Sequence, residues 1–250
     1  MSGSKVLVEA CVDGVPSALA AEAGGAGRLE LCSGLSEGGI TPSVGLIEMV
    51  RERTRLPLFV LIRPRGGDFL YDAEEFEVMR RDVTTAGLLG ADGVVLGVLQ
   101  SNGMVDAERT AALIEAARPL DVTFHRAFDF TQDAEAALER LIALGVDRVL
   151  TSGQAARAVD GVATIAGLVR RAAGRIGIVA GGGIRPDNIK AVVQGSGVTE
   201  VHLRGSGAVQ SGMEFRRAGI ALNKPQETGE YAWTETMESV IREVVAVAGT

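Results

Sequence analysis

Two short segments near the amino terminus each place a carboxylate and a thiol two residues apart. The first reads LVEACV and the second RLELCSGL, so Glu9 precedes Cys11 with the same spacing as Glu30 precedes Cys32. In a β-strand, side chains two residues apart point to the same face. Each strand would therefore present an acid–base group beside a thiolate, which is a soft metal ligand. The chain has two cysteines, and both belong to this pattern.

Other residues with chemical potential also lie at or just after apolar runs. Arg63 follows LFVLI, and His125 follows DVTF, so these two join Glu9 and Glu30 as candidate catalytic groups. A second set, suited to holding a substrate or another anion, comprises Arg65, Arg126, Ser152, Gly181, Gly182, Gly183, His202 and Gly205. Glycine loops expose backbone N–H groups, and guanidinium and imidazole groups donate hydrogen bonds to anions.

Eight apolar runs are predicted as the strands that position these groups. They cover residues 5–12, 28–33, 58–64, 93–98, 122–128, 148–153, 175–183 and 200–205. Alanine-rich segments with helical periodicity separate them, and several begin at a capping residue such as Asp72, Asp106 or Asp133. Strands that alternate with helices and read as continuous apolar runs are typical of parallel sheets.

The α/β pattern predicts one TIM barrel, a closed (β/α)₈ fold, across residues 1–250. The barrel core is expected at about residues 5–205, with a loop and a C-terminal helix in 206–250. A doubly wound open sheet is the alternative, but the turn ACVDGVPS after the first strand lacks the GxGxxG pattern of such folds.

The barrel would gather the polar residues at one end, because active sites of this fold lie at the carboxyl ends of the strands. The first two strands are neighbours. If they align by their shared motif, Cys11 and Cys32 lie side by side above Glu9 and Glu30. Leu29 and Leu31, on the other parity, would then pack against helices.

Composition excludes several classes of function. The net charge is -7, and no block of basic residues is present, so nucleic acid is not an expected partner. No segment approaches the roughly 20 apolar residues that span a bilayer, and the first residues do not resemble a signal peptide. We therefore expect a cytoplasmic protein with free thiols and no membrane partner. A homo-oligomer is compatible with a barrel of this size.

Three interpretations of the polar ring remain open at this point. The carboxylates and arginines could pair with one another and stabilise the barrel without further function. The two thiols, with or without His125, could bind Cu(I) or zinc. Alternatively, the glycine loops after the seventh and eighth strands could hold the anionic group, such as a phosphate, of a small metabolite.

Several motifs closely resemble the CutC family, which is named for copper homeostasis. They are LEACVD, LELCSGLSEGGITPS, LIRPRGGDFLYD, GVVLGVL, VTFHRAFD and DRVLTSGQA, together with the three glycines of the seventh strand. The resemblance covers roughly residues 5–205 and implies a cytoplasmic TIM barrel that binds copper, as Cu(I), through Cys11 and Cys32. Gly27 and the pair Leu203–Arg204 depart from the family pattern. The leading expectation is thus a copper-binding protein, and an enzyme for an anionic metabolite is the alternative.

Overall fold

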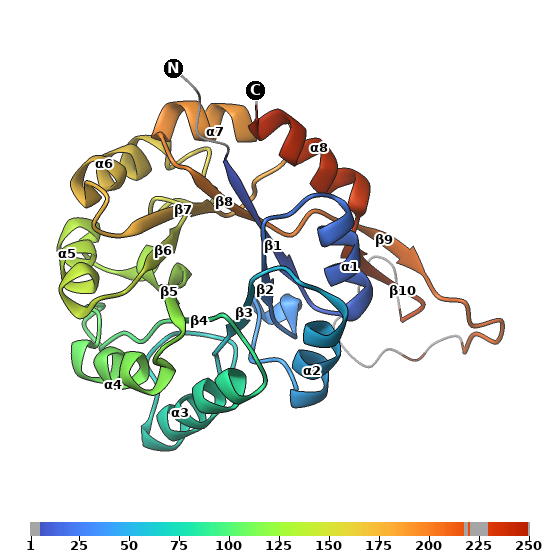
Figure 1. Cartoon of the computed structure of the whole chain (residues 1–250), viewed down its shortest axis with the longest axis horizontal. Helices are drawn as coiled ribbons and strands as arrows, with labels where there is room; N and C mark the ends of the chain where they lie inside the picture. Colours follow the sequence, from blue (N-terminus) through green and yellow to red (C-terminus); the bar gives the residue numbers. More distant parts are fainter. Residues whose placement is uncertain (1–5, 218–219, 221–229, 250) are drawn as a thin grey trace.

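The computed structural model describes residues 6–217, 220 and 230–249, and Figure 1 shows them as a ring of helices around a barrel of strands. The barrel strands are β1 (Leu7–Val12), β2 (Arg28–Leu31), β3 (Leu58–Leu61), β4 (Gly93–Leu96), β5 (Asp121–Phe124), β6 (Arg148–Thr151), β7 (Gly177–Gly181) and β8 (Glu200–Leu203). All neighbours pair in parallel, and β8 closes on β1. The predicted TIM barrel is confirmed.

The connecting helices follow the strands in the order expected for this fold. They are α1 (Val15–Ala23), α2 (Val44–Arg53), α3 (Ala73–Leu88), α4 (Ala107–Ala117), α5 (Ala134–Leu144), α6 (Val162–Ala172) and α7 (Ile189–Ser196), with short 3₁₀ turns at Leu35–Glu37 and Arg126–Phe130. Asp72, Asp106 and Asp133 each cap a helix by accepting backbone N–H groups, as their positions in the sequence predict.

The two faces of the strands have different partners. Leu29 and Leu31 belong to the large apolar core between the barrel and its helices. The opposite parity faces the barrel interior, where Cys11, Cys32 and Phe59 pack in a separate small cluster. This arrangement agrees with the predicted alternation of side chains along β1 and β2.

The register between β1 and β2 corrects the expected alignment of their motifs. Cys11 lies opposite Glu30, and Glu9 lies opposite Arg28. The register therefore differs by two residues from the expected one, in which Cys11 would lie opposite Cys32. Closing eight tilted strands into a barrel requires a stagger between neighbours, and local motif similarity does not report that stagger. The shift places Cys32 one step beyond the end of β2, where its N–H donates to Val12 O.

The segment after β8 also differs from the prediction of a loop and a helix. β9 (Ser206–Gln210) and β10 (Ala232–Thr236) form an antiparallel pair that projects from the barrel, before α8 (Glu238–Ala248) completes the helical ring (Figure 1). A two-stranded pair depends on contacts between residues far apart in sequence, so local polarity did not indicate it. In the described part of the chain, no helix has the length and apolar character to cross a membrane.

Candidate functional site

A cavity of about 640 Å³ opens at the carboxyl ends of the barrel strands, and β1, β2, β3, β5, β6, β7 and β8 or the loops after them line it. Its lining residues come from the strand ends and the loops that follow them. They include Cys11, Glu30, Arg63, Phe69, His125, Arg126, Gly182, Gly183, Arg185, His202, Arg204 and Gly205. The polar ring predicted from the sequence therefore surrounds a cavity large enough for a metabolite.

Cys11 lines one wall of this cavity and contacts the fully buried Cys32. The Sγ atoms of Cys11 and Cys32 lie 3.7 Å apart, and Cys11 Sγ also lies 3.7 Å from Glu30 Oε1. Both cysteines are buried and free. The hydrogen bond with Cys32 and burial together raise the pKa of the Cys11 thiol well above its ordinary value. Cys11 is therefore a protonated thiol at neutral pH until a cation takes the place of the proton.

Beneath the thiols, Glu9 joins two cations across three neighbouring strands. Arg28 Nε donates to one oxygen of Glu9, and His202 Nδ1 lies 2.7 Å from the other. Arg28 also binds Glu200 at 2.6 Å and covers the ring of Phe59. Because Glu9 has no exposed surface, this pairing satisfies a charge that would otherwise be costly to bury.

The pKa values of Glu9, Glu30 and His202 are shifted from their ordinary values. Burial opposes the charged form of Glu9, but the His202 hydrogen bond and the Arg28 charge outweigh it and lower the pKa of Glu9 to about 2. Burial raises the pKa of Glu30, and the nearby charge of Glu9 adds to the effect. Burial also opposes the imidazolium, but the charges of Glu30 and Glu9 and the hydrogen bonds with Cys11 and Glu9 raise the pKa of His202 well above 6.5.

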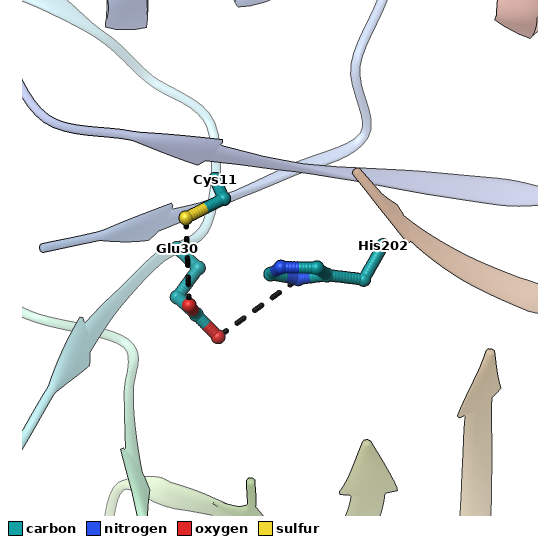
Figure 2. A group of neighbouring side chains, drawn as sticks. All are labelled: Cys11, Glu30 and His202. Carbon is teal, nitrogen blue, oxygen red and sulfur yellow. Dashed lines mark hydrogen bonds and ion pairs between the residues drawn. The ribbon is translucent and has the colours of Figure 1, made fainter. Parts of the chain in front are cut away.

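Cys11, Glu30 and His202 form the group of side chains that could hold a metal ion, with one ligand atom of each within 4.8 Å of the others (Figure 2). Figure 2 shows the three side chains converging from β1, β2 and β8. Cys32 was predicted as a ligand, and its thiol contacts this group through Cys11. His202 was predicted as an anion-binding residue, whereas in the structure its ring lies against Glu9 and Glu30.

His125 lies on the far side of the cavity from the thiols, just after β5. Its Nδ1 accepts the N–H of Ala127, so the hydrogen of the neutral ring is on Nε2. That buried Nε2 has no hydrogen-bond partner among the described residues. Burial and the neighbouring charge of Arg63 lower the pKa of His125 to about 3. His125 is therefore a neutral hydrogen-bond donor, and the structure does not bring it to the thiols as a third metal ligand.

Arg63 also lines the cavity, and its guanidinium connects two loops. Its terminal nitrogens donate to the backbone oxygens of Glu37, Gly39 and Gly67 at 2.7, 2.7 and 2.8 Å. The side chain also lies over the ring of Phe69. Arg126 reaches the cavity from the turn after β5, where Asp129 and Ser152 fix its guanidinium at 2.8 Å each.

Five predicted site residues lie outside the cavity lining, which corrects the sequence interpretation. Cys32 is fully buried and reaches the site only through its contact with Cys11. Glu9 is underneath, bound to Arg28 and His202. Arg65 points away and binds Glu75 at 2.5 Å, because the loop after β3 turns outward. The Ser152 hydroxyl is taken by Asp129, Arg126 and Ala155 O. Gly181 is still within β7, where a Cβ would strike Leu150.

Three further residues at the site were not among the candidates from the sequence. Arg28 and Glu200 stand at the start of their strands, where the barrel stagger places Arg28 opposite Glu9 and Glu200 within 2.6 Å of Arg28. Arg185 lines the cavity from the loop after the glycines of β7. The interior parity of Arg28 in a buried strand is a signal that could have identified it, since a buried arginine needs a partner.

The amino-acid sequence is similar to those of known proteins of one family. The CutC family model matches residues 6–207. A human protein described as a copper homeostasis protein cutC homolog is 48% identical over 242 residues, which cover 97% of this chain and 89% of that protein. A CutC protein from Xanthomonas axonopodis pv. citri is 55% identical over 202 residues, 81% of this chain and 84% of its own length.

Solved structures show the same barrel. A CutC protein from Streptococcus agalactiae superposes with a TM-score of 0.76 at 34% identity, covering 79% of this chain and 97% of that one. A thiamine phosphate pyrophosphorylase from Pyrococcus furiosus superposes with a TM-score of 0.60 at 17% identity, covering 98% of this chain and 96% of that one. The second likeness concerns the fold alone.

Proposed function

Since the chain belongs to the CutC family, a family named for copper homeostasis, we propose that it binds Cu(I) through Cys11 and Cys32 at the mouth of the barrel. The observation that carries the proposal is the 3.7 Å separation of the two sulfur atoms. The expected setting is the cytoplasm, where thiols stay reduced.

The sulfur separation fits two thiolates on one ion. With metal–sulfur bonds of about 2.3 Å, a distance of 3.7 Å corresponds to a sulfur–metal–sulfur angle of about 107°. A linear two-coordinate ion would require sulfur atoms about 4.6 Å apart, nearly 1 Å more than observed. The pair therefore favours a site with a third donor over a linear one.

The neighbouring groups also suit a cation. Glu30 Oε2 is buried and has no hydrogen-bond partner among the described residues. The other oxygen of Glu30 lies 3.7 Å from Cys11 Sγ, so this carboxyl is next to the thiols and is available as a third donor. Copper binding would release the protons of the thiols, because thiolate is the ligand form.

A titration under reducing, oxygen-free conditions against a competing Cu(I) chelator tests the proposal. The Cys11→Ser and Cys32→Ser variants should each bind Cu(I) more weakly than wild type, and the double variant should lose the site. Met49→Leu, which changes an exposed sulfur on α2, is the matched control and should bind as wild type does. Equal affinity of the double variant and wild type would refute the proposal.

The cavity itself favours a second candidate function, an enzyme that acts on a small anionic metabolite. Its volume of about 640 Å³ greatly exceeds the space that a single ion needs. Arg63, Arg126, Arg185 and Arg204 line it, against the one carboxylate Glu30 in that lining. A rise in melting temperature with small phosphorylated or carboxylated compounds supports this function, and its absence across such a panel contradicts it.

A further inference from the structure

We propose that the cavity binds a small organic anion whose acidic group lies against Arg63 and His125, on the wall formed by the ends of β3 and β5. The inference rests on the second candidate function and adds where the acid is held and by which atoms. The sequence pattern predicted instead that the glycine loops after β7 and β8 hold the anion. In the structure, two buried N–H donors that lack an acceptor among the described residues, Arg63 Nε and His125 Nε2, lie on the opposite side of the barrel mouth.

Arg63 is a buried cation without an acidic partner. Its side chain is nine-tenths buried, and no carboxylate among the described residues lies within ion-pair distance of it. Three backbone oxygens accept from its terminal nitrogens, whereas its Nε–H has no acceptor at hydrogen-bonding geometry in the described part of the chain. The buried Tyr71 hydroxyl is a further polar neighbour of this guanidinium and carries no charge. Carbonyl dipoles stabilise a guanidinium but leave its charge in place, so an anion beside it would be strongly favoured.

His125 supplies a second unused donor next to this charge. Its Nε2–H is buried and unpartnered among the described residues, and the hydrogen bond from Ala127 N to Nδ1 fixes the ring orientation. Phe69 holds the two groups together, because the Arg63 guanidinium lies 5.2 Å from its ring centre and the His125 ring 5.0 Å away. Two N–H donors on a rigid wall suit an oxyanion, either a carboxylate or a phosphate ester.

The rest of the cavity indicates an organic body rather than a lone inorganic ion. About 640 Å³ is within the range of cavities that hold metabolites. Apolar side chains, including Leu61, Phe130 and Ile184, line it beside the charged ones. At the rim, Arg185 has no carboxylate within ion-pair distance among the described residues, so the entrance attracts anions.

Calorimetric titration at low ionic strength tests the site with three matched probes. They are glycerol 3-phosphate, glycerate and uncharged glycerol, which share a three-carbon body and differ in the acidic group. We expect binding of one or both anions and no binding of glycerol. Which anion binds more tightly distinguishes a phosphate site from a carboxylate site.

Variants then locate the acidic group. His125→Phe keeps the packing on Phe69, removes the Nε2–H and should weaken anion binding at least about 10-fold, because a hydrogen bond to a charged acceptor is lost. Arg63→Lys should also weaken it. Arg81→Gln, an exposed change on α3, is the matched control and should have no effect. If the Arg63 variant does not fold, NMR of the wild type replaces it. The His125 Nε2–H proton resonance should then shift when the anion is added.

The outcomes separate this inference from the function on which it rests. If an anion binds the wild type but His125→Phe binds it equally well and the His125 resonance does not shift, the acidic group lies elsewhere. The inference is then wrong, while the second candidate function stands. If neither anion binds the wild type, both are wrong, and the copper titration remains an independent measurement.

Discussion

His125, whose buried Nε2–H has no partner among the described residues, should make the protein less stable in mild acid. The pKa of His125 is about 3 in the folded protein, against an ordinary 6.5 in the unfolded chain. Between these values the unfolded state binds the additional proton. The contribution of His125 is thus fully present above pH 6.5 and is lost as the pH falls toward 3.

These two pKa values give a loss of about 2 kcal/mol between pH 7 and pH 5, and about 3 kcal/mol between pH 7 and pH 4. The change to test is His125→Phe, which removes the titrating group. The free energy of unfolding, measured in urea on metal-free protein, should therefore fall by about 2 kcal/mol more in wild type than in the variant between pH 7 and pH 5.

The carboxylates and His202 titrate in both wild type and His125→Phe. Their contributions to the free energy of unfolding therefore cancel when the two proteins are compared at the same pH. His202 acts in the opposite direction, because its pKa is raised on folding and its contribution is lost as the pH rises. Since the chain has two histidines, the imidazole nitrogen signals that disappear in His125→Phe belong to His125, and those that remain belong to His202. Parallel stability curves for wild type and His125→Phe, or a His125 ring that titrates near pH 6.5, would contradict the lowered pKa of His125.

Three further predictions concern the buried site. Glu9→Gln should lower the free energy of unfolding by about 3–5 kcal/mol, because two buried cations lose their shared acid; urea titration checks this, with exposed Glu77→Gln as a control expected to change little. The apparent Cu(I) affinity should rise from pH 6 to pH 8, since the pKa of the Cys11 thiol is raised and binding removes its proton; a pH-independent chelator competition would contradict it. Gly97→Ala should cost about 1–3 kcal/mol in the same urea assay, because a Cβ would lie 2.5 Å from the His125 ring; unchanged stability would mean that the ring is mobile.

Much of the fold could be predicted because its determinants are local. The eight apolar runs, the aspartate caps and the two-residue spacing of Glu30 and Cys32 each act within one element. The alternation that directs Leu31 outward and Cys32 inward follows from strand geometry alone. The β9–β10 pair was missed because its strands are separated by more than twenty residues and gain stability only by pairing.

Most of the residues at the barrel mouth could be predicted from the sequence, since they lie near the carboxyl ends of strands and parallel strands end together. The tertiary structure decided how they are combined. Barrel closure staggers β1 against β2, so that Cys11 faces Glu30 while Glu9 sits below with Arg28 and His202. The same closure separates His125 from the thiols and leaves it beside Arg63. Charge state and pairing depend on burial and on neighbours from distant strands, and those arise only when the barrel closes.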